Sequence, residues 1–417
     1  MPSFRTRPQT RLSHLGFPPD VGPWTYRVLP EPTLTSELAR LAVAKTIGDV
    51  SCVSLQPCPN PEYQSQDRYV VHEWALPGGT WKFTAVFDGY GGEEAVDYIV
   101  DALPPMIRNG LSTAVSGAEG KLPPIVVSNV LSQSISSFDD ALTNDLLDLF
   151  PGGPDAVAKL SDDEIRAVIN DHATGGKNNA KVLRCMRGST ALVSLVDPQA
   201  QNLWVASLGD CQAVLGFENP LGQWEASILS TNHNGTDTSE VDRLHSEHPN
   251  EPECVLRDRV LGAIAVTRAI GDQLFKLPGV YTKRVFQNCS PGFRLSTPIS
   301  DFIGRNKTPP YLSNKADVRH VNLGSSTMAK RFLIMCSDGL VDLYMYDSAR
   351  TGTLQTVVKG WVDLVGRARS HTPSGNSALS LLRDALGGND EDRVSQMLTV
   401  EMVWKWMDDT TVLVQPL

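Results

Sequence analysis

The sequence lacks the features that mark membrane-spanning, disulfide-rich and nucleic-acid-binding proteins. Its longest apolar runs, such as residues 332–336, are far shorter than the roughly 18–20 residues of a membrane-spanning helix. The seven cysteines are scattered and include no C-x-x-C pair, so neither a disulfide framework nor a zinc knuckle is indicated. The net charge is −10, and the absence of a basic patch argues against nucleic-acid binding. We expect no membrane span and no nucleic-acid partner.

The N-terminal segment carries no apolar stretch of the secretory type, which predicts a protein that is not secreted. Residues 1–19 do contain three arginines and no acidic residue, a composition that is weakly similar to a mitochondrial transit peptide. A loose basic terminus explains the same composition. The expected location is intracellular, either cytoplasmic or mitochondrial.

The composition is that of a globular protein with one large domain. Of 417 residues, 41% are apolar and 20% are charged, which is ordinary for a folded chain. No fixed-period repeat and no long Gly/Ser or Pro-rich linker divides the chain. We predict a partly disordered N-terminal extension over residues 1–50 and one domain over residues 51–417, with insertions near 273–307 and 348–400.

Short β patterns alternate irregularly with helical ones. The segment 81–87 predicts a strand, and the apolar spacing over 95–103 predicts a helix that Pro104 and Pro105 end. A three-stranded β meander is expected over 189–217. Because strands and helices do not alternate strictly, an antiparallel α+β fold is favoured. Further strands are predicted at 331–336 and 410–414, and further helices at 162–170, 239–246 and 354–368.

Four aspartates stand at the ends of predicted strands: Asp88, Asp210, Asp338 and Asp408. Each alone is typical of an ordinary turn. Gathered at one end of a sheet, however, their charges would repel one another unless a divalent cation bound them. Oxygen ligands suit Mg²⁺ or Mn²⁺, and the histidines and cysteines show no zinc spacing. A P-loop, a G-x-S-x-G elbow and a C-x₅-R loop are also absent, so metal-activated water is the favoured chemistry.

Eight strings, in the same order, resemble the metal-dependent Ser/Thr protein phosphatases of type 2C (PPM). The likeness extends over roughly residues 51–415, and three further stretches are similar to the pyruvate dehydrogenase phosphatase branch of that family. The strings are QDRYVV (66–71), VFDGYGG (86–92), GSTALV (188–193), LWVASLGDCQAVL (203–215), LSTNHN (229–234), LGAIAVTRAIGD (261–272), MCSDGLVD (335–342) and DDTTVLV (408–414).

The resemblance implies a β-sandwich of two antiparallel sheets flanked by helices, with a metal cleft at one end. Asp88 matches the aspartate that bridges two ions, and Gly89 matches the glycine whose carbonyl binds the second ion. Asp338 and Asp408 match the carboxylates that complete the shell of the first ion. Asp67 corresponds to the acid that hydrogen-bonds metal-bound water. The implied cofactor is Mg²⁺ or Mn²⁺, and the implied partner is a phosphoprotein substrate.

Two residues depart from the family pattern. Gln66 replaces the glutamate of a Glu-Asp pair, which puts a neutral amide in the shell of the second ion and predicts a weak second site. Tyr90 replaces the histidine thought to protonate the leaving oxygen, and tyrosine is the poorer acid near pH 7. Asp210 and Asp342 match the ligands of a third, weaker ion. The family's phosphate-binding arginine has no clear counterpart. Two hypotheses follow: an active, attenuated phosphatase, or a pseudophosphatase that binds partners without turnover.

Overall fold

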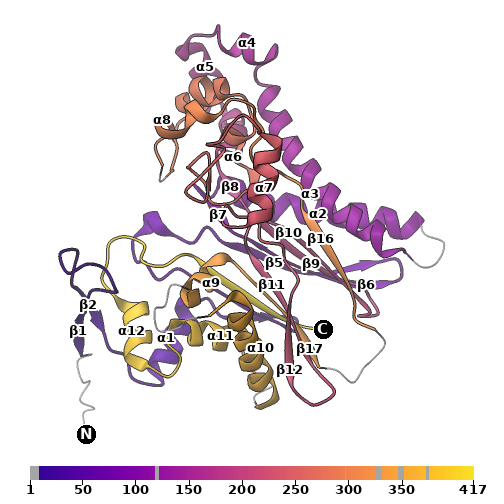
Figure 1. Ribbon diagram of the computed structural model, residues 1–417, viewed down its shortest axis with the longest axis vertical. Helices are drawn as coiled ribbons and strands as arrows, with labels where there is room; N and C mark the ends of the chain where they lie inside the picture. Colours follow the sequence, from indigo (N-terminus) through magenta and orange to yellow (C-terminus); the bar gives the residue numbers. More distant parts are fainter. Residues whose placement is uncertain (1–8, 118–121, 296, 325–329, 346–351, 372–374) are drawn as a thin grey trace. The chain divides into compact units, whose positions relative to one another are not determined.

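The computed structural model describes residues 9–117, 122–295, 297–324, 330–345, 352–371 and 375–417. The chain divides into two compact units, and each is assembled from segments that are distant in sequence. Figure 1 follows the chain by colour and labels its helices and strands. Unit 1 comprises Met1–Asp67, Ala213–Ile228 and Thr327–Leu417, and unit 2 comprises Arg68–Gln212 and Leu229–Ser326.

Unit 2 contains a five-stranded sheet with the order β16-β10-β9-β6-β5, and every neighbouring pair in it is antiparallel. Its central strand β9 is buried at every residue, as expected for a run of β-branched and aliphatic side chains that are covered on both faces. The strands are β5 (Arg68–Leu76), β6 (Gly79–Phe87), β9 (Ala191–Val196), β10 (Asn202–Leu208) and β16 (Asp317–Asn322).

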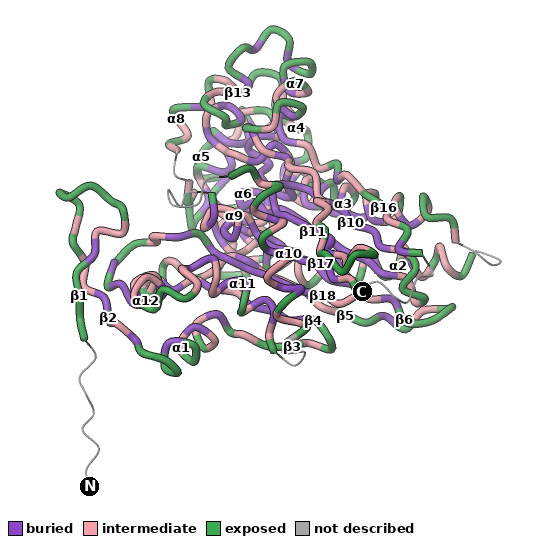
Figure 2. Tube along the Cα trace, turned by 60° about the horizontal axis from the view of Figure 1, so that its bottom comes forward, coloured by how far each residue is buried: buried purple, intermediate pink, exposed green. Residues whose placement is uncertain are grey.

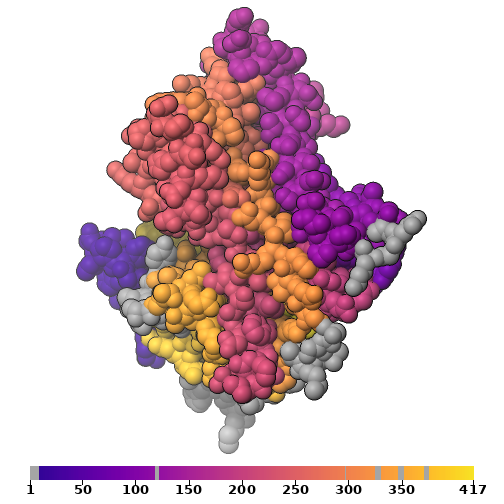
Figure 3. Space-filling model, turned by 45° about the vertical axis from the view of Figure 1, so that its right-hand side comes forward, coloured from indigo at the N-terminus to yellow at the C-terminus, as the bar shows by residue number. Residues whose placement is uncertain are grey.

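Two long helices, α2 (Glu94–Gly117) and α3 (Pro124–Leu147), pack against each other and against this sheet. Figure 3 shows α3, in purple, beside the orange segment that leads into β16. Ser132 and Ser136 of α3 donate hydrogen bonds to the backbone carbonyls of Ala316 and Asn314, at 3.3 and 3.1 Å. Unit 2 also contains α4 (Gly153–Val157), α5 (Asp162–Ile169), α6 (Lys177–Met186), α7 (Thr238–Glu247) and α8 (Ile299–Phe302), and the short strands β7 (Gly89–Tyr90), β8 (Gly188–Ser189), β13 (Val255–Leu256), β14 (Arg259–Val260) and β15 (Ile270–Gly271).

The prediction that Pro104 and Pro105 end a helix is wrong, because α2 continues through both prolines to Gly117. A proline inside a helix costs about 3 kcal/mol, since it removes a backbone donor and clashes with the preceding turn. Apolar burial on both sides of the prolines offsets that cost, and Leu103, Ile107 and Leu111 are fully buried in the core of unit 2. Tertiary packing here overrides local propensity.

Unit 1 contains a six-stranded sheet with the order β12-β11-β17-β18-β4-β3. The pairs β11–β12, β17–β18, β18–β4 and β4–β3 are antiparallel, and the N-terminal strands β1 and β2 form a separate antiparallel pair. The strands are β1 (Thr10–Ser13), β2 (Trp24–Arg27), β3 (Lys45–Ile47), β4 (Val50–Leu55), β11 (Gln212–Glu218), β12 (Trp224–Ile228), β17 (Arg331–Cys336) and β18 (Thr410–Pro416).

Helices from both ends of the chain share the core of unit 1. Leu34 and Leu38 of α1 are buried in the same apolar cluster as Trp361 of α10 and Leu381 of α11. Residues 9–49 thus contribute the helix α1 and the strands β1, β2 and β3 to this unit. Its helices are α1 (Thr33–Leu41), α9 (Asp338–Met345), α10 (Leu354–His371), α11 (Ser377–Leu386) and α12 (Glu391–Thr399).

The predicted β meander over 189–217 is also wrong in its last step. β9 and β10 are neighbours, but β11 pairs with β12 in the sheet of unit 1 and not with β10. Between β10 and β11 the chain bends at Gly209, whose φ of +101° is in the left-handed region that favours glycine. The strand spacing predicted the strands correctly but not the sheet that each one joins.

The α+β fold with two antiparallel sheets flanked by helices is confirmed. The inner strands of both sheets are largely buried, as the purple segments in Figure 2 show, whereas the edge strands β12 and β16 contain no buried residue. The helices predicted at 162–170, 239–246 and 354–368 correspond to α5, α7 and α10. None of the helices in the described ranges has both the length and the apolar character that crossing a bilayer requires.

Candidate metal centre

Three carboxylates of unit 1 lie together at the ends of two paired strands. β17 ends at Cys336, and α9 begins two residues later at Asp338. Asp342 follows at the i+4 position, which places both side chains on the same face of the helix. Asp408 lies just before β18, the antiparallel neighbour of β17. One carboxylate oxygen from each of the three aspartates lies within 4.8 Å of the other two.

Asp67 is buried near Asp408 and accepts a hydrogen bond from a serine. Its side chain is 4% exposed, and Ser337 Oγ donates to its Oδ2 at 2.7 Å. The Ser337 hydroxyl in turn accepts the backbone N–H of Thr411 at 3.0 Å. Burial and the neighbouring Asp409 and Asp408 carboxylates raise the pKa of Asp67 to about 7. Extra positive charge near Asp67 would favour its ionised form.

Asp409 fixes the segment that carries Gln66 and Asp67 and leads into β5. It is 4% exposed, and its Oδ2 accepts the backbone N–H of Gln66 at 2.8 Å. Its Oδ1 accepts a hydrogen bond from Gln56 Nε2 at 2.8 Å. Asp409 is therefore buried and hydrogen-bonded to Gln56 and Gln66. Its neighbour Asp408 is more exposed and belongs to the carboxylate group with Asp338 and Asp342.

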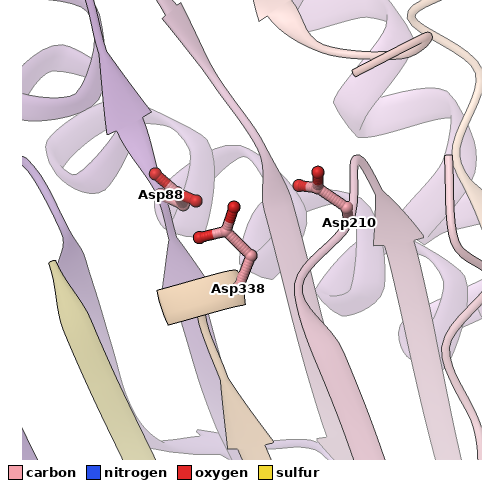
Figure 4. A group of neighbouring side chains, drawn as sticks. All are labelled: Asp88, Asp210 and Asp338. Atoms are coloured by element: carbon pink, nitrogen blue, oxygen red, sulfur yellow. The ribbon is translucent and has the colours of Figure 1, made fainter. Parts of the chain in front are cut away.

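Unit 2 carries a second group of acids at strand ends. Asp88 follows β6, and Asp210 follows Gly209 at the bend after β10; Figure 4 shows both of these positions and the start of α9 at Asp338. Carboxylate oxygens of Asp88 and Asp210 lie within 4.8 Å of each other. Asn234 Nδ2 donates to Asp210 Oδ2 at 2.7 Å, which orients this carboxylate.

The glycine and tyrosine after Asp88 form the short strand β7, which pairs with β8. Gly89 is buried. The Tyr90 hydroxyl donates to Asp272 Oδ2 at 2.8 Å. Burial, followed by the Asp272 carboxylate, raises the pKa of Tyr90 well above its ordinary value. Burial likewise raises the pKa of Asp272 to about 7.

The donor atoms fit a hard divalent cation. Both groups offer carboxylate oxygens, which are the ligands that Mg²⁺ and Mn²⁺ take, and neither group includes the histidine or cysteine expected of a zinc site. The negative charges of carboxylates this close together repel one another, and a divalent ion would relieve that repulsion. The residues therefore fit the metal that the sequence pattern predicts.

Three residues of these groups were not identified from the sequence. Ser337 and Asn234 lie within recognised strings, yet their contacts with Asp67 and Asp210 are too distant in sequence to predict. Lys405 gave no signal at all, because a lysine before a strand is usually solvated. In the structure its ammonium group lies 2.5 Å from Asp408 Oδ1.

The protein phosphatase 2C family model matches residues 73–360, which is more than half of the chain. The chain belongs to the protein phosphatase 2C family. The family is one of metal-dependent protein-serine/threonine phosphatases, and the sequence resemblance is confirmed. Of the aspartates assigned above, Asp88, Asp210, Asp338 and Asp342 fall inside the matched range.

The chain is also similar to individual phosphatases. It is 27% identical to a protein phosphatase 2C homolog of Schizosaccharomyces pombe over 390 residues, which covers 87% of this chain and 78% of that protein. It is 32% identical to mitochondrial pyruvate dehydrogenase phosphatase 1 of Bos taurus over 268 residues, or 57% of this chain. The match spans 49% of the bovine protein, about half its length.

A solved structure of a sex-determining protein from C. elegans has the same fold. It superposes with a TM-score of 0.50 at 17% sequence identity and covers 89% of this chain and 65% of that one. At this identity the likeness concerns the architecture alone. The assignment to protein phosphatase 2C therefore rests on the sequence model, and the structure adds the arrangement of the side chains.

Proposed function

We propose that the chain hydrolyses phosphoserine and phosphothreonine in proteins with the help of two Mg²⁺ or Mn²⁺ ions. The observation that carries this proposal is the group of Asp338, Asp342 and Asp408 oxygens within 4.8 Å of one another. In the proposed assignment Asp338 and Asp408 bind the first ion, and Asp88 and the Gly89 carbonyl complete the ligands that the family uses. Asp210 and Asp342 are assigned to a third, weaker ion.

The bound ions would supply charge neutralisation of the phosphate and a lowered pKa for water. The protein's own groups position the reaction. Asp67, which is buried and fixed by Ser337, orients the attacking water by accepting its hydrogen bond. Gln66 contributes an amide oxygen next to it. A direct attack of this kind passes through no phosphorylated side chain, so none of the residues assigned here acts as a nucleophile.

We further propose that turnover of phosphoserine is slow. The Tyr90 hydroxyl donates a hydrogen bond to Asp272, so it is engaged where the family has a histidine that protonates the leaving oxygen. An ordinary tyrosine, with a pKa near 10, is a weaker acid than imidazole with a pKa near 6.5. Loss of a general acid is worth about 10²–10⁴ in rate. Gln66 brings no charge, which supports a weak second site.

The experiment compares two substrates with and without metal. An aryl phosphate, whose phenolate leaves without protonation, should be hydrolysed much faster than a phosphoserine peptide. Both activities should require Mn²⁺ or Mg²⁺ and disappear in Asp338→Ala. Tyr90→His should raise the rate on phosphoserine selectively, and Gln66→Glu should lower the Mn²⁺ concentration needed for half-maximal rate. Metal-independent hydrolysis would refute the proposal, and equal rates on both substrates would refute the role given to Tyr90.

The alternative is a pseudophosphatase that binds phosphoproteins without turnover. The Tyr90–Asp272 hydrogen bond favours this alternative, because it engages the hydroxyl at the position where the family has its acid. Calorimetry with Mn²⁺ beside the aryl phosphate assay separates the two. Metal binding without hydrolysis of either substrate selects the pseudophosphatase, whereas measurable aryl phosphatase activity selects the enzyme.

The similarity to pyruvate dehydrogenase phosphatases supports a phosphorylated dehydrogenase subunit as the first substrate to test. We propose that the segments 273–307 and 348–400 select the substrate, since loops on a fixed scaffold usually carry specificity. The compartment is proposed to be mitochondrial or cytoplasmic. Imaging of a tagged full-length chain in cells decides between them, and an exclusively extracellular signal would contradict both.

A further inference from the structure

Lys405 lies in the segment between α12 and β18, and its ammonium group contacts two consecutive aspartates. Nζ lies 2.5 Å from Asp408 Oδ1 and 3.3 Å from Asp409 Oδ1. The side chain is 29% exposed, so protein atoms cover most of its length. One positive charge is therefore held between two carboxylates, and one of them, Asp408, is assigned to metal binding.

The two aspartates differ in what they can offer a metal ion. Both oxygens of Asp409 are taken, by Gln56 Nε2 and the Gln66 N–H, and the side chain is 4% exposed. Asp408 is 46% exposed, and one of its oxygens lies within 4.8 Å of oxygens of Asp338 and Asp342. Lys405 thus pairs with a member of the carboxylate group, Asp408, and has a second partner in Asp409.

We propose that Lys405 is a tethered counter-ion that competes with the divalent ion for Asp408 and thereby sets the metal affinity of the phosphatase. This inference rests on the proposed function, because it takes Asp408 to be a metal ligand. In the metal-free protein the ammonium neutralises Asp408. When a divalent ion binds the same carboxylate, the ion pair must loosen and the two cations repel each other.

The magnitude follows from the charges. Two unit charges about 4 Å apart in water change a binding constant by about fivefold, and a double charge changes it by about thirtyfold. Because the flexible lysine stem can move the ammonium away and keep it near Asp409, part of the repulsion is relieved. Removal of the charge should therefore strengthen metal binding by about tenfold.

A lysine that merely orders Asp408 for binding makes the opposite prediction. In that case its removal would free the Asp408 side chain, raise the entropic cost of coordination and weaken metal binding. A lysine that forms an ordinary surface pair would change nothing, because exposed pairs contribute about 0–1 kcal/mol. The sign of the change in affinity therefore separates the three roles.

The test is calorimetric titration of Mn²⁺ into the full-length chain after removal of metal with a chelator. Lys405→Gln should bind Mn²⁺ about tenfold more tightly than wild type, and Lys405→Arg, which keeps the charge, should stay within about threefold of wild type. Lys359→Gln is the matched control: Lys359 pairs with Asp363 at 2.6 Å in α10 and should leave the affinity unchanged.

Thermal unfolding supplies a second readout that does not depend on activity. Lys405→Gln should unfold at a lower temperature than wild type in chelator, because the acidic group loses its cation, and this deficit should vanish in saturating Mn²⁺. Equal or weaker Mn²⁺ binding by Lys405→Gln overturns the inference. If neither wild type nor Lys405→Gln binds Mn²⁺, the proposed metal site fails as well, whereas binding by Lys405→Gln alone supports both.

Discussion

The substitution Glu240→Gln tests how a buried charge network stabilises unit 2. Glu240, in the first turn of α7, is 3% exposed and accepts hydrogen bonds from Thr267 and from both Arg243 and Arg268. Arg268 also pairs with Asp317 at 3.2 Å. The variant keeps the shape of the side chain but removes its charge and so leaves two guanidinium groups undercompensated.

The expected cost is about 2–3 kcal/mol. Breaking a buried ion pair from one side typically costs about 3–5 kcal/mol. The lower figure applies here because each arginine keeps another acid: Arg268 keeps Asp317, and Arg243 keeps Glu247 at 2.8 Å. At about 2–4 °C per kcal/mol for a unit of this size, the melting temperature should fall by about 4–12 °C. Glu247→Gln, at a half-exposed position, is the control and should change stability by less than about 1 kcal/mol.

The pH dependence has a defined sign. Burial alone would raise the pKa of Glu240, but hydrogen bonds from Arg268 and Arg243 outweigh it and hold the pKa well below its ordinary value. The stabilisation is therefore complete above the unfolded-state pKa near 4.3 and is lost as the pH falls below it. Calorimetry of wild type and Glu240→Gln between pH 7 and pH 3 should show a difference in the free energy of unfolding that becomes smaller in acid. A difference below about 1 kcal/mol at pH 7, or one that grows on acidification, would refute this reasoning.

Three further perturbations have defined outcomes. Gly209→Ala forces a side chain into the left-handed region and brings its Cβ to within 2.5 Å of Thr190 Cγ2, so denaturant unfolding should show a loss of at least about 1–3 kcal/mol; an unchanged midpoint would contradict the strain argument. Trp361→Ala removes a side chain that is 1% exposed and should cost about 3–5 kcal/mol, whereas a loss below 1 kcal/mol would mean that the site collapses around the gap. A thiol-reactive reagent should modify Cys58 rapidly and the six buried cysteines only on unfolding, and a fast phase that survives Cys58→Ser would disprove this order of accessibility.

Strand ends and helix faces were predictable because they follow from short-range patterns. The strand 331–336 and its following Asp338 were located from a short apolar run and a terminal acid, and α10 from its apolar spacing. Family strings then assigned roles to Asp88 and Asp408. The domain boundary at residue 50 stays a prediction, and the structure adds that Leu34 is buried in the core of unit 1.

Long-range choices were not predictable from the same patterns. Whether β11 joins β10 or β12 depends on the whole sheet and not on the turn between them. The Tyr90–Asp272 hydrogen bond joins residues 182 positions apart. Lys405 becomes informative only when its neighbours are known, because its charge matters through Asp408 and Asp409. Such contacts are set by tertiary packing, which a single sequence does not display.

The position of β18 in the sheet of unit 1 has a consequence for the order of folding. β18 lies between β17 and β4, and Thr411 of β18 bonds to Ser54 of β4, 357 residues away in the chain. During synthesis β4 is made early, and its edge opposite β3 stays unpaired until β18 has been synthesised. Pairing over so long a separation is intrinsically slow. Because Lys405 and Asp408 precede β18 by only a few residues, the acids of unit 1 gather only when β18 pairs, so a nascent chain lacks the carboxylate group of unit 1 with which to capture metal.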